Sequence, residues 1–539
     1  MATGKKRKDA IPEFVNKQLH GGVVPVASLP EDVQASLHAL KPRQRSLHGS
    51  KFSLAYFPFS SVASPCGDRF GYMAPEAVRR ATRLPFDPAT QALVEQLGGL
   101  MASSAPDPTP GVIPAGFTYL GQFVDHDVTL DVSSRLEVDT DATTVPNMRS
   151  PVLDLDSVYG RGPVLDPFLY EFPATAPESA IRFALGSNTP VGPGGPGGPA
   201  GFGGMREQKN FDVPRVLNAL DPAKGSKAAI IGDPRNDENL IIVQLHHAML
   251  KFHNAVVARV VAEGFAGDIF VEAKKRVIHH YQWAVTHDFL RHVCGQAAVD
   301  AAIATISAPV GSSFEMPVEF AVAAYRFGHS MVRDRYWVSF KFPNASLAEV
   351  FKFNRVPELP VRSEWVVDFN AFFDTGIAVP VHNKAQLIDS KLALGLESIP
   401  GFSGMMAILA SRNLRRGLAL GLPSGQGMAD FFEVAPLTAV ELTSGLPAAE
   451  VAVLESNGGL LLGKTPLWYY VLREAAVKEG GQKLGAVGAR IVAETFVRML
   501  KRDANSYLNA AGFAPNLPSD APGNFTFADL LRMAGVTTP

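Results

Sequence analysis

The 539-residue chain has only two cysteines, Cys66 and Cys294, and they lie far apart in the sequence. This scarcity excludes a disulfide-rich secreted scaffold and predicts a reducing compartment or a bacterium that avoids disulfides. No apolar segment follows the basic start, and no uninterrupted apolar run reaches about 18 residues. We therefore expect no export signal, no membrane span and a cytoplasmic location.

An excess of charge of one sign is also missing. The chain has 50 Lys and Arg against 52 Asp and Glu, for a net charge of −2, so neither nucleic acid nor an anionic membrane is expected as a partner. Hydrophobic residues make up 46% of the sequence, which is ordinary for a globular protein. Composition leaves the oligomeric state open.

Apolar residues at steps of three and four dominate the second half of the sequence. Strand-like pieces, such as 337–340, are short. We predict a mainly α fold with few short strands and long loops. The helices are expected at 240–261, 271–293, 318–332, 405–418, 466–478 and 485–501.

The domain organisation follows from the same pattern. Residues 1–85 are rich in loops and turns and are predicted to form an extended N-terminal arm. Residues 86–539 are predicted to form one large helical domain without internal repeats. Within it, the Gly/Pro-rich stretch 191–204 cannot pack regularly and should be a surface loop.

The most informative segment is Asp125-His126-Asp127, which puts a histidine between two carboxylates soon after the apolar pair Phe123-Val124. Neighbouring carboxylates repel, and burying one is costly unless it is neutralised, hydrogen-bonded or ligated to a metal. On this segment alone, an exposed loop with an incidental histidine is an equally good interpretation.

Two later segments bear on that choice. Arg235 and Glu238 stand three residues apart at the start of the predicted helix 240–261, where a capped helix with an acidic first turn is the alternative interpretation. His329 follows a glycine in an otherwise apolar stretch. By itself it would more often be a buried core histidine than a ligand.

Together these segments resemble the peroxidase-cyclooxygenase superfamily, the animal-type haem peroxidases, in order and in spacing from about residue 118 to 428. That family's Gly-Gln-x-x-Asp-His-Asp pattern is complete at 121–127, and its Arg-(Phe/Tyr)-Gly-His segment matches 326–329. The resemblance implies a helical domain that encloses haem b, and we expect a bacterial member.

The resemblance also implies roles for individual residues. Cleaving the O–O bond of hydrogen peroxide needs a neutral imidazole that moves a proton and a fixed positive charge near the leaving oxygen. His126 and Arg235 match these two catalytic groups, and Gln122 matches a residue beside the family's halide site. On the other side of the haem, the predicted cofactor-binding residues are the iron ligand His329, its hydrogen-bond partner Gln426, and Arg326.

Two carboxylates match positions that form ester links to haem in relatives, namely Asp125 and Glu238. Esterification would remove their charge and so relieve the repulsion around His126. Some relatives have a methionine after the glutamate, which adds a sulfonium link. Here that residue is Asn239, so no sulfonium link is expected.

The resemblance further implies a calcium site. Oxygen ligands at alternating positions in a loop suit this hard cation, although the segment alone is more simply interpreted as a polar turn. A filled site would fix the residue next to His126. The ligands would be Asp127, Ser150, the carbonyl oxygen of Val152, Asp154 and Asp156.

The resulting functional prediction is a haem peroxidase that uses hydrogen peroxide, through a ferryl intermediate, to oxidise halide, thiocyanate or phenols. A haem fatty-acid dioxygenase is the alternative, but Arg326 stands where those relatives have their tyrosine, and Tyr325 is one place further back. A non-catalytic haem-binding or adhesion protein is the third hypothesis. The remaining histidines, His246-His247, His253, His279-His280 and His287, are interpreted as helix packing rather than as a second metal site.

Overall fold

The computed structural model describes most of the protein after residue 68. The predicted loop at 191–204, Cys66 and the N-terminal arm up to residue 68, apart from two short strands, lie outside the described residues. The described ranges are 14–17, 22–25, 69–103, 111–131, 134–171, 181–188, 211–216, 228–354, 359–397 and 404–537.

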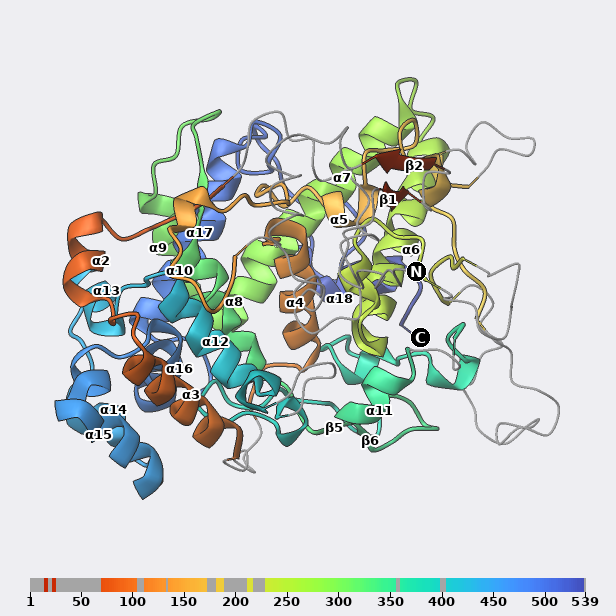
Figure 1. The fold of residues 1–539 in the computed structure, drawn as a ribbon. Coiled ribbons are helices and arrows are strands. Elements are labelled where there is room, and N and C mark those ends of the chain that lie inside the picture. The colour runs from red at the N-terminus through yellow and green to blue at the C-terminus, as the bar shows by residue number, and fades with distance from the viewer. Residues whose placement is uncertain are drawn as a thin grey trace, which may run out of the picture.

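Helices form most of the described structure, which confirms the predicted mainly α fold (Figure 1). In the first half these are α2 (Glu76–Thr82), α3 (Pro88–Ser103), α4 (Gly116–Val128), α5 (Asp156–Tyr159), α6 (Leu240–Ala262), α7 (Ile269–Ala284), α8 (Leu290–Cys294) and α9 (Gln296–Thr305). In the second half they are α10 (Val318–Ala321), α11 (Leu347–Lys352), α12 (Leu409–Ala419), α13 (Gly425–Phe431), α14 (Ala439–Thr443), α15 (Ala448–Gly463), α16 (Leu467–Glu479), α17 (Ala486–Arg502) and α18 (Phe527–Met533).

The strands form three two-stranded sheets. β1 (Phe14–Lys17) pairs with β2 (Gly22–Pro25), β3 (Arg69–Gly71) with β4 (Glu315–Pro317), and β5 (Arg335–Tyr336) with β6 (Ala345–Ser346). The β3–β4 pair is parallel, with Phe70 opposite Met316, and the other two pairs are antiparallel.

Five of the six predicted helices are confirmed within a few residues. The predicted helix 271–293 is continuous through α7, a π-helical turn at Val285–Phe289 and α8. The other confirmed helices are α6, α12, α16 and α17.

The predicted helix 318–332 is wrong. α10 ends at Ala321, and Ala323 has φ −129° and ψ −83°, which are not helical angles. The backbone then forms the 3₁₀ helix η11 (Ala324–His329). Apolar periodicity continues across this break because both pieces bury residues in the same core, so the pattern could not reveal it.

The predicted strand at 337–340 is also wrong, since strand pairing is confined to the preceding residues Arg335–Tyr336. The backbone of 337–340 bonds to loops instead. The amide of Trp337 donates to Asn383 Oδ1, and the carbonyl of Val338 accepts from the amide of Asp368. Trp337 and Val338 are buried without strand pairing and Phe340 is exposed, so a short apolar run resembled a strand.

The described end of the predicted N-terminal arm is packed on the helical domain. Phe70 is buried in the core, and the amides of Met73 and Ala74 donate to the carboxylate of Glu319. α2 contacts α13. Residues 69–85 therefore contact the helices directly, and the boundary at residue 85 stays a prediction.

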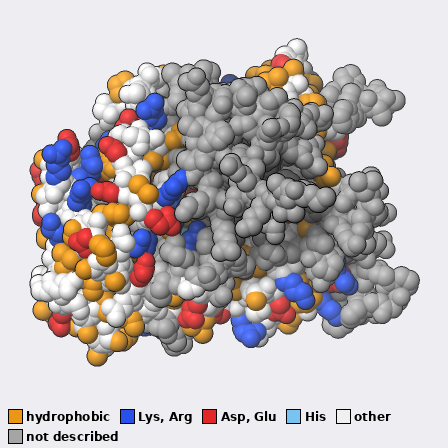
Figure 2. All heavy atoms as spheres, viewed as in Figure 1, with side chains coloured by type: hydrophobic (Ala, Val, Ile, Leu, Met, Phe, Trp, Pro, Cys, Tyr) orange, Lys and Arg blue, Asp and Glu red, His pale blue; other side chains and the backbone are white. Residues whose placement is uncertain are grey.

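α4 lies near the middle of the molecule and contacts α5, α6, the 3₁₀ helix η9 (Pro234–Asp237) and η11 (Figure 1). It thus joins the segments that carry the sequence motifs. Figure 2 shows basic and acidic side chains interspersed over the described part of one face, in keeping with the small net charge. Among the described helices, none is both long and apolar enough to cross a bilayer.

Candidate active site

His126 projects from the last turn of α4 and is buried. Its Nδ1 lies 2.8 Å from Oδ1 of Asn236 in η9, and an amide oxygen only accepts, so Nδ1 is the donor. Burial and the charge of Arg235 lower the pKa of His126 to about 3, so the ring is neutral. The ring's unprotonated atom is therefore Nε2, as a proton acceptor requires.

Arg235, in η9, anchors the backbone of α4. Its guanidinium donates to the carbonyl oxygen of His126 at 2.8 Å and to that of Thr129 at 2.9 Å. It also forms a buried ion pair with Asp233 at 2.8 Å. The predicted positive charge is thus beside His126, and it holds that residue in place.

Asp233 is shared between two arginines, because Arg149 also pairs with its Oδ2 atom. Although burial opposes ionisation, Arg149 and Arg235 hold the pKa of Asp233 well below its usual range. The three groups together carry one net positive charge. Arg149 also reaches Asp156 at 3.3 Å, so the ion pairs extend from Arg235 to the predicted calcium loop.

His329 ends η11, and its ring contacts Asn413 of α12. Asn413 Oδ1 accepts from the guanidinium of Arg326 at 2.6 Å, and its Nδ2 lies 2.7 Å from Nδ1 of His329. Three residues make one turn of a 3₁₀ helix, so Arg326 and His329 face the same side and share this one amide. Trp468 supports the turn by donating to the carbonyl of Arg326 at 3.1 Å.

The predicted partner of His329, Gln426, is wrong. Its side chain instead bonds to the segment before α16, donating to Leu462 O and Thr465 Oγ1 at 2.8 Å and accepting from the Thr465 amide at 3.0 Å. Gln426 thus ties α13 to that segment. The amide at His329 comes from Asn413, thirteen residues earlier in the sequence.

Asn413 also constrains how His329 could hold iron. In the structure the amide nitrogen faces His329 Nδ1 and donates to it, because the amide oxygen is used by Arg326. Ligation through Nε2 needs a proton on Nδ1 and an acceptor for it. Turning the Asn413 amide supplies that acceptor, but it also turns the amide nitrogen toward the guanidinium of Arg326, so Arg326 must then give up its bond to Asn413.

The two predicted ester-forming carboxylates are both held by short polar contacts near the end of α4. Asp125 accepts from the hydroxyl of Thr129 at 2.8 Å, and Glu238 accepts from the amide of Gln122. Burial raises the pKa of Asp125, although the nearby charge of Arg235 opposes the rise. Both side chains remain partly accessible.

Asn239, where some relatives have methionine, has a structural role. Its Oδ1 atom forms the N-terminal cap of α6 by accepting from the amides of Ile241 and Ile242, at 3.1 and 3.0 Å. Asparagine is among the best helix caps, so the substitution also stabilises the start of α6.

Three of these residues are neither fully buried nor exposed. Burial is the largest cause of the pKa shifts of Asp125, Arg326 and His329, yet their side chains are partly accessible. A methyl group added at Gly328 would meet no atom within 4 Å, so space is open beside His329. The residues fit a bulky group held between α4 and η11.

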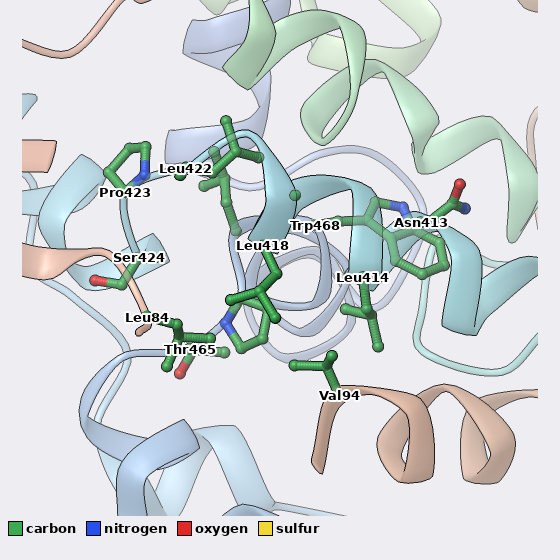
Figure 3. Close-up of a pocket in the computed structure, with 14 residues that line it drawn as sticks. Leu84, Val94, Asn413, Leu414, Leu418, Leu422, Pro423, Ser424, Thr465 and Trp468 are labelled. Carbon is green, nitrogen blue, oxygen red and sulfur yellow. The ribbon is translucent and has the colours of Figure 1, made fainter. Parts of the chain in front are cut away.

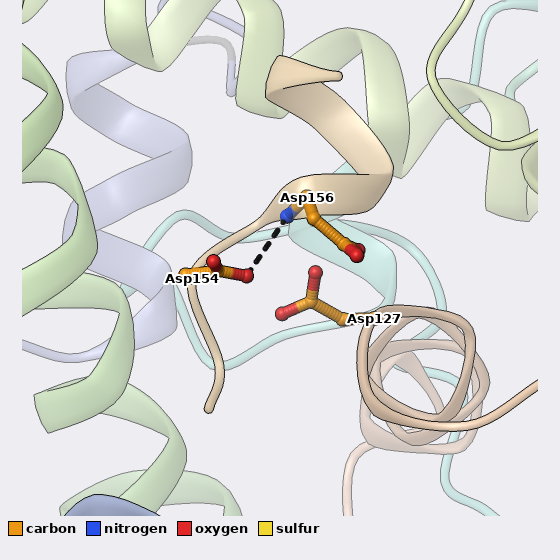
Figure 4. Close-up of side chains that lie close together, drawn as sticks. All are labelled: Asp127, Asp154 and Asp156. Atoms are coloured by element: carbon orange, nitrogen blue, oxygen red, sulfur yellow. Dashed lines mark hydrogen bonds between the residues drawn. The ribbon is translucent and has the colours of Figure 1, made fainter. Parts of the chain in front are cut away.

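The predicted calcium residues converge in part. Oxygens of Asp127, Asp154 and Asp156 lie within 4.8 Å of one another, and their side chains point together between α4 and the start of α5 (Figure 4). Burial and the charge of Asp156 raise the pKa of Asp154 to about 7. Within the described ranges, these carboxylates form the one cluster of three or more metal-ligating side chains, so the histidine pairs on α6 and α7 build no such site.

The other two predicted calcium ligands have protein partners. The amide of Ser150 donates to Asp156 at 3.1 Å, and the carbonyl of Val152 accepts from Gln282 at 3.3 Å. A carbonyl oxygen has a second lone pair, so Val152 can still serve a cation. Both residues stay predicted ligands.

An apolar pocket borders Asn413 and lies between α3, α12 and the start of α16 (Figure 3). Leu414, Leu418, Leu422 and Trp468 contribute to its lining. Neither His126 nor His329 lines this pocket. The pocket therefore lies beside Asn413 but contains neither histidine of the candidate site.

Comparison with known proteins supports the same interpretation. The model of the animal haem peroxidase family matches residues 203–513. Chorion peroxidase of Drosophila melanogaster is 26% identical over 297 residues, which are 53% of this chain and 35% of that protein. Dual oxidase of the same organism is 27% identical over 132 residues, which are 23% of this chain and 8% of that protein.

Solved structures share the fold. Peroxidase A from Dictyostelium discoideum has a TM-score of 0.55 and 15% identity, over 88% of this chain and 94% of that chain. A fatty acid alpha-dioxygenase of Oryza sativa has a TM-score of 0.51 and 13% identity, over 83% of this chain and 77% of that chain.

Because the family match covers more than half of the sequence, this protein belongs to the animal haem peroxidase family. Membership implies haem as the cofactor. The protein spans about a third or less of the length of the curated relatives it matches.

Sequence reasoning missed three residues near His126 and His329. Asn413 lies beside Leu414 on the buried side of α12, and a buried amide on an apolar helix face needs a partner, which was the available signal. Asn236 follows Arg235 directly and could have been considered with it. His246 was interpreted as packing, and nothing in the sequence distinguishes it from its neighbour His247.

Substitutions at Asn413 and Gln426 test which of the two residues is the hydrogen-bond partner of His329. Asn413→Leu should lower haem affinity or turnover by about 10–100-fold, as is typical when a ligand's hydrogen-bond partner is lost. Gln426→Leu is the matched control, and it should leave the haem affinity of the folded protein unchanged. Titrating haem into both variants measures this. Equal losses, or a loss confined to Gln426→Leu, would restore the sequence-based choice.

Proposed function

We propose that this protein is a haem-dependent peroxidase that uses hydrogen peroxide to oxidise a small donor such as a halide, thiocyanate or a phenol. The observation that carries the proposal is the state of His126. It is buried and neutral, its Nδ1 donates to Asn236, and its Nε2 is left to accept a proton. The family's haem and the positions of Asp125, Arg326 and His329 support it.

His329 would hold the haem iron through Nε2, with Asn413 accepting from Nδ1. Asp125 and Glu238 would lie against the haem edge. When bound, the haem supplies the redox chemistry that breaks the O–O bond and takes electrons from the donor.

The protein's own residues manage the proton. His126 Nε2 accepts the proton of the near oxygen of hydrogen peroxide and returns it to the far oxygen, which leaves as water, so His126 ends neutral. Arg235 fixes the position of His126 through the carbonyl bond and adds positive charge where the leaving oxygen becomes negative. Burial of both groups keeps them in one arrangement.

A fatty-acid dioxygenase is the second candidate, and one observation favours it. The hydroxyl of Tyr325 is buried without a hydrogen-bond partner among the described residues, and it lies 3.9 Å from where a side chain at Gly121 would begin. The fold is shared with a fatty acid alpha-dioxygenase, one structure of which contains palmitic acid. Tyr325 stands one place before the position of the tyrosine in those relatives.

Oxygen uptake separates the two candidates. The haem-loaded protein should oxidise guaiacol, iodide or thiocyanate when hydrogen peroxide is added, and should consume no dissolved oxygen with palmitic acid. Oxygen uptake that depends on palmitic acid and is lost in Tyr325→Phe would establish the dioxygenase instead.

We also propose ester links from Asp125 and Glu238 to the haem. After peroxide treatment, acid–butanone should leave haem on the wild-type protein, and intact-mass measurement should show the added mass. Asp125→Ala and Glu238→Gln should each lose one link, and no sulfonium link should form because Asn239 has no sulfur atom. Haem that is freely extracted after peroxide treatment would show that the carboxylates stay unlinked.

A calcium ion at Asp127, Asp154 and Asp156 is the third part of the proposal. Its positive charge would offset the repulsion between these three neighbouring carboxylates. Because Asp127 follows His126 in the sequence, a bound ion would also fix the residue next to His126. Chelation with EGTA should lower thermal stability and slow the reaction with peroxide, and added Ca²⁺ should restore both. Elemental analysis should give one calcium per protein molecule. A calcium-free protein with full stability would refute the site.

A further inference from the structure

Two side chains stand in series behind His126. Asn236 Oδ1 lies 2.8 Å from His126 Nδ1, and Asn236 Nδ2 lies 3.1 Å from Nδ1 of His246. His126 is 4% exposed, and Asn236 and His246 are 0% exposed. The three residues come from α4, η9 and α6, so they join three separate elements.

The direction of each hydrogen bond follows from what an amide can do. The amide oxygen only accepts, so His126 Nδ1 carries a proton and donates it. The amide nitrogen only donates, so His246 Nδ1 accepts and carries no proton. If the amide were turned over, its nitrogen would face His126, and the proton of His126 would move to Nε2.

The amide of Asn236 bonds to both rings, so the tautomers of His126 and His246 are coupled through it. Burial lowers the pKa of His246 to about 3, so its ring is neutral and carries a single proton, on Nε2. That Nε2 is buried and has no hydrogen-bond partner in the part of the protein that the structure describes. The bond from Asn236 to Nδ1 holds His246 in this tautomer, and the unpaired donor at Nε2 is what this arrangement costs in stability. The ring packs edge-on against Phe123, at 6.2 Å between centroids, which fixes its plane.

We propose that Asn236 and His246 are positioning residues that hold His126 with its proton on Nδ1, so that Nε2 faces the peroxide as a base. The inference rests on the proposed peroxidase function for its use, but the tautomer is a property of the protein itself. Neither residue touches peroxide, and both act only through His126.

The variants separate positioning from packing. Asn236→Asp keeps an oxygen that accepts from His126, whereas Asn236→Leu removes it at similar volume. His246→Asn keeps a polar atom that can accept near the place of Nδ1, whereas His246→Leu does not. Asn236→Leu should slow the reaction with peroxide by at least about 10-fold, toward the roughly 10²–10⁴-fold loss of a positioned acid–base group. Asn236→Asp should keep most of the wild-type rate.

Neutron diffraction from deuterated crystals of the haem-loaded protein shows which ring nitrogen of His126 carries the deuteron. A role in packing alone would not change that position. We expect a deuteron on Nδ1 of His126 in the wild type and in Asn236→Asp, and on Nε2 or divided between the two nitrogens in Asn236→Leu and His246→Leu. A deuteron on Nε2 of His126 in the wild type would overturn the inference. So would an unchanged peroxide rate in Asn236→Leu. A wild type with the expected deuterons but no reaction with peroxide would instead refute the proposed function.

Discussion

His329→Ala should give a folded protein that binds haem weakly and has little or no peroxidase activity. His329 is the one imidazole that η11 directs toward Asn413 and the open space beside Gly328. Its loss would remove the proposed bond to the haem iron. The measurement is a haem titration followed by the absorption spectrum, with thermal unfolding to confirm that the variant is folded.

His382→Ala is the matched control, because His382 is exposed and lies outside the site. It should bind haem and turn over as the wild type does. If His329→Ala shows a normal high-spin ferric spectrum and full turnover, another residue holds the iron, and the assignment of His329 as the iron ligand is wrong.

His126→Ala should bind haem almost normally but react with hydrogen peroxide about 10²–10⁴-fold more slowly. The variant removes the group that accepts the proton and leaves the residues around His329 untouched. Stopped-flow mixing with a range of peroxide concentrations gives the second-order rate constant directly. Haem content, measured on the same samples, separates a slow reaction from a lost cofactor.

Arg235→Leu should slow the same step, since it removes both the anchor on the His126 carbonyl and the adjacent positive charge. It also leaves Asp233 with Arg149 alone, so some loss of stability is expected. Unchanged rates of the reaction with peroxide in both His126→Ala and Arg235→Leu would refute the roles proposed for these two residues.

The sequence predicted the long helices well because their apolar residues continue over several turns. α6, α16 and α17 are buried on all sides along part of their length, so the length of the apolar run, rather than one buried stripe, identified them. The failure at 318–332 has a physical cause, since Ala323 departs from helical angles while the apolar pattern runs on. That departure creates the 3₁₀ turn that sets Arg326 and His329 on one side.

The motif residues were predictable because their chemistry restricts the residue type and their order is fixed. The structure brings His126, Arg235, Asp125 and Glu238 together around one end of α4, and their roles there stay predictions. The supporting residues were harder to predict. Many amides can accept a hydrogen bond, and which one reaches His329 depends on how α12 packs, so Gln426 was chosen where Asn413 lies.

His246 is a second residue whose contact could not be predicted from the sequence. Its sequence neighbourhood is apolar and helical, which is the setting of a packed core histidine. Only the contact between α6 and η9 reveals that its Nδ1 faces Asn236. The three residues of such a series come from distant positions in the sequence, so no regular spacing indicates that they belong together.

The most direct test of the central claim is the absorption spectrum of the purified protein with one equivalent of haem, recorded before and after one equivalent of hydrogen peroxide. A single high-spin ferric haem should bind per protein molecule, its spectrum should change within the mixing time of a stopped-flow instrument, and a donor such as guaiacol should return it to the ferric form while being oxidised. A protein that binds no haem, or binds it without any spectral response to peroxide, would contradict the account.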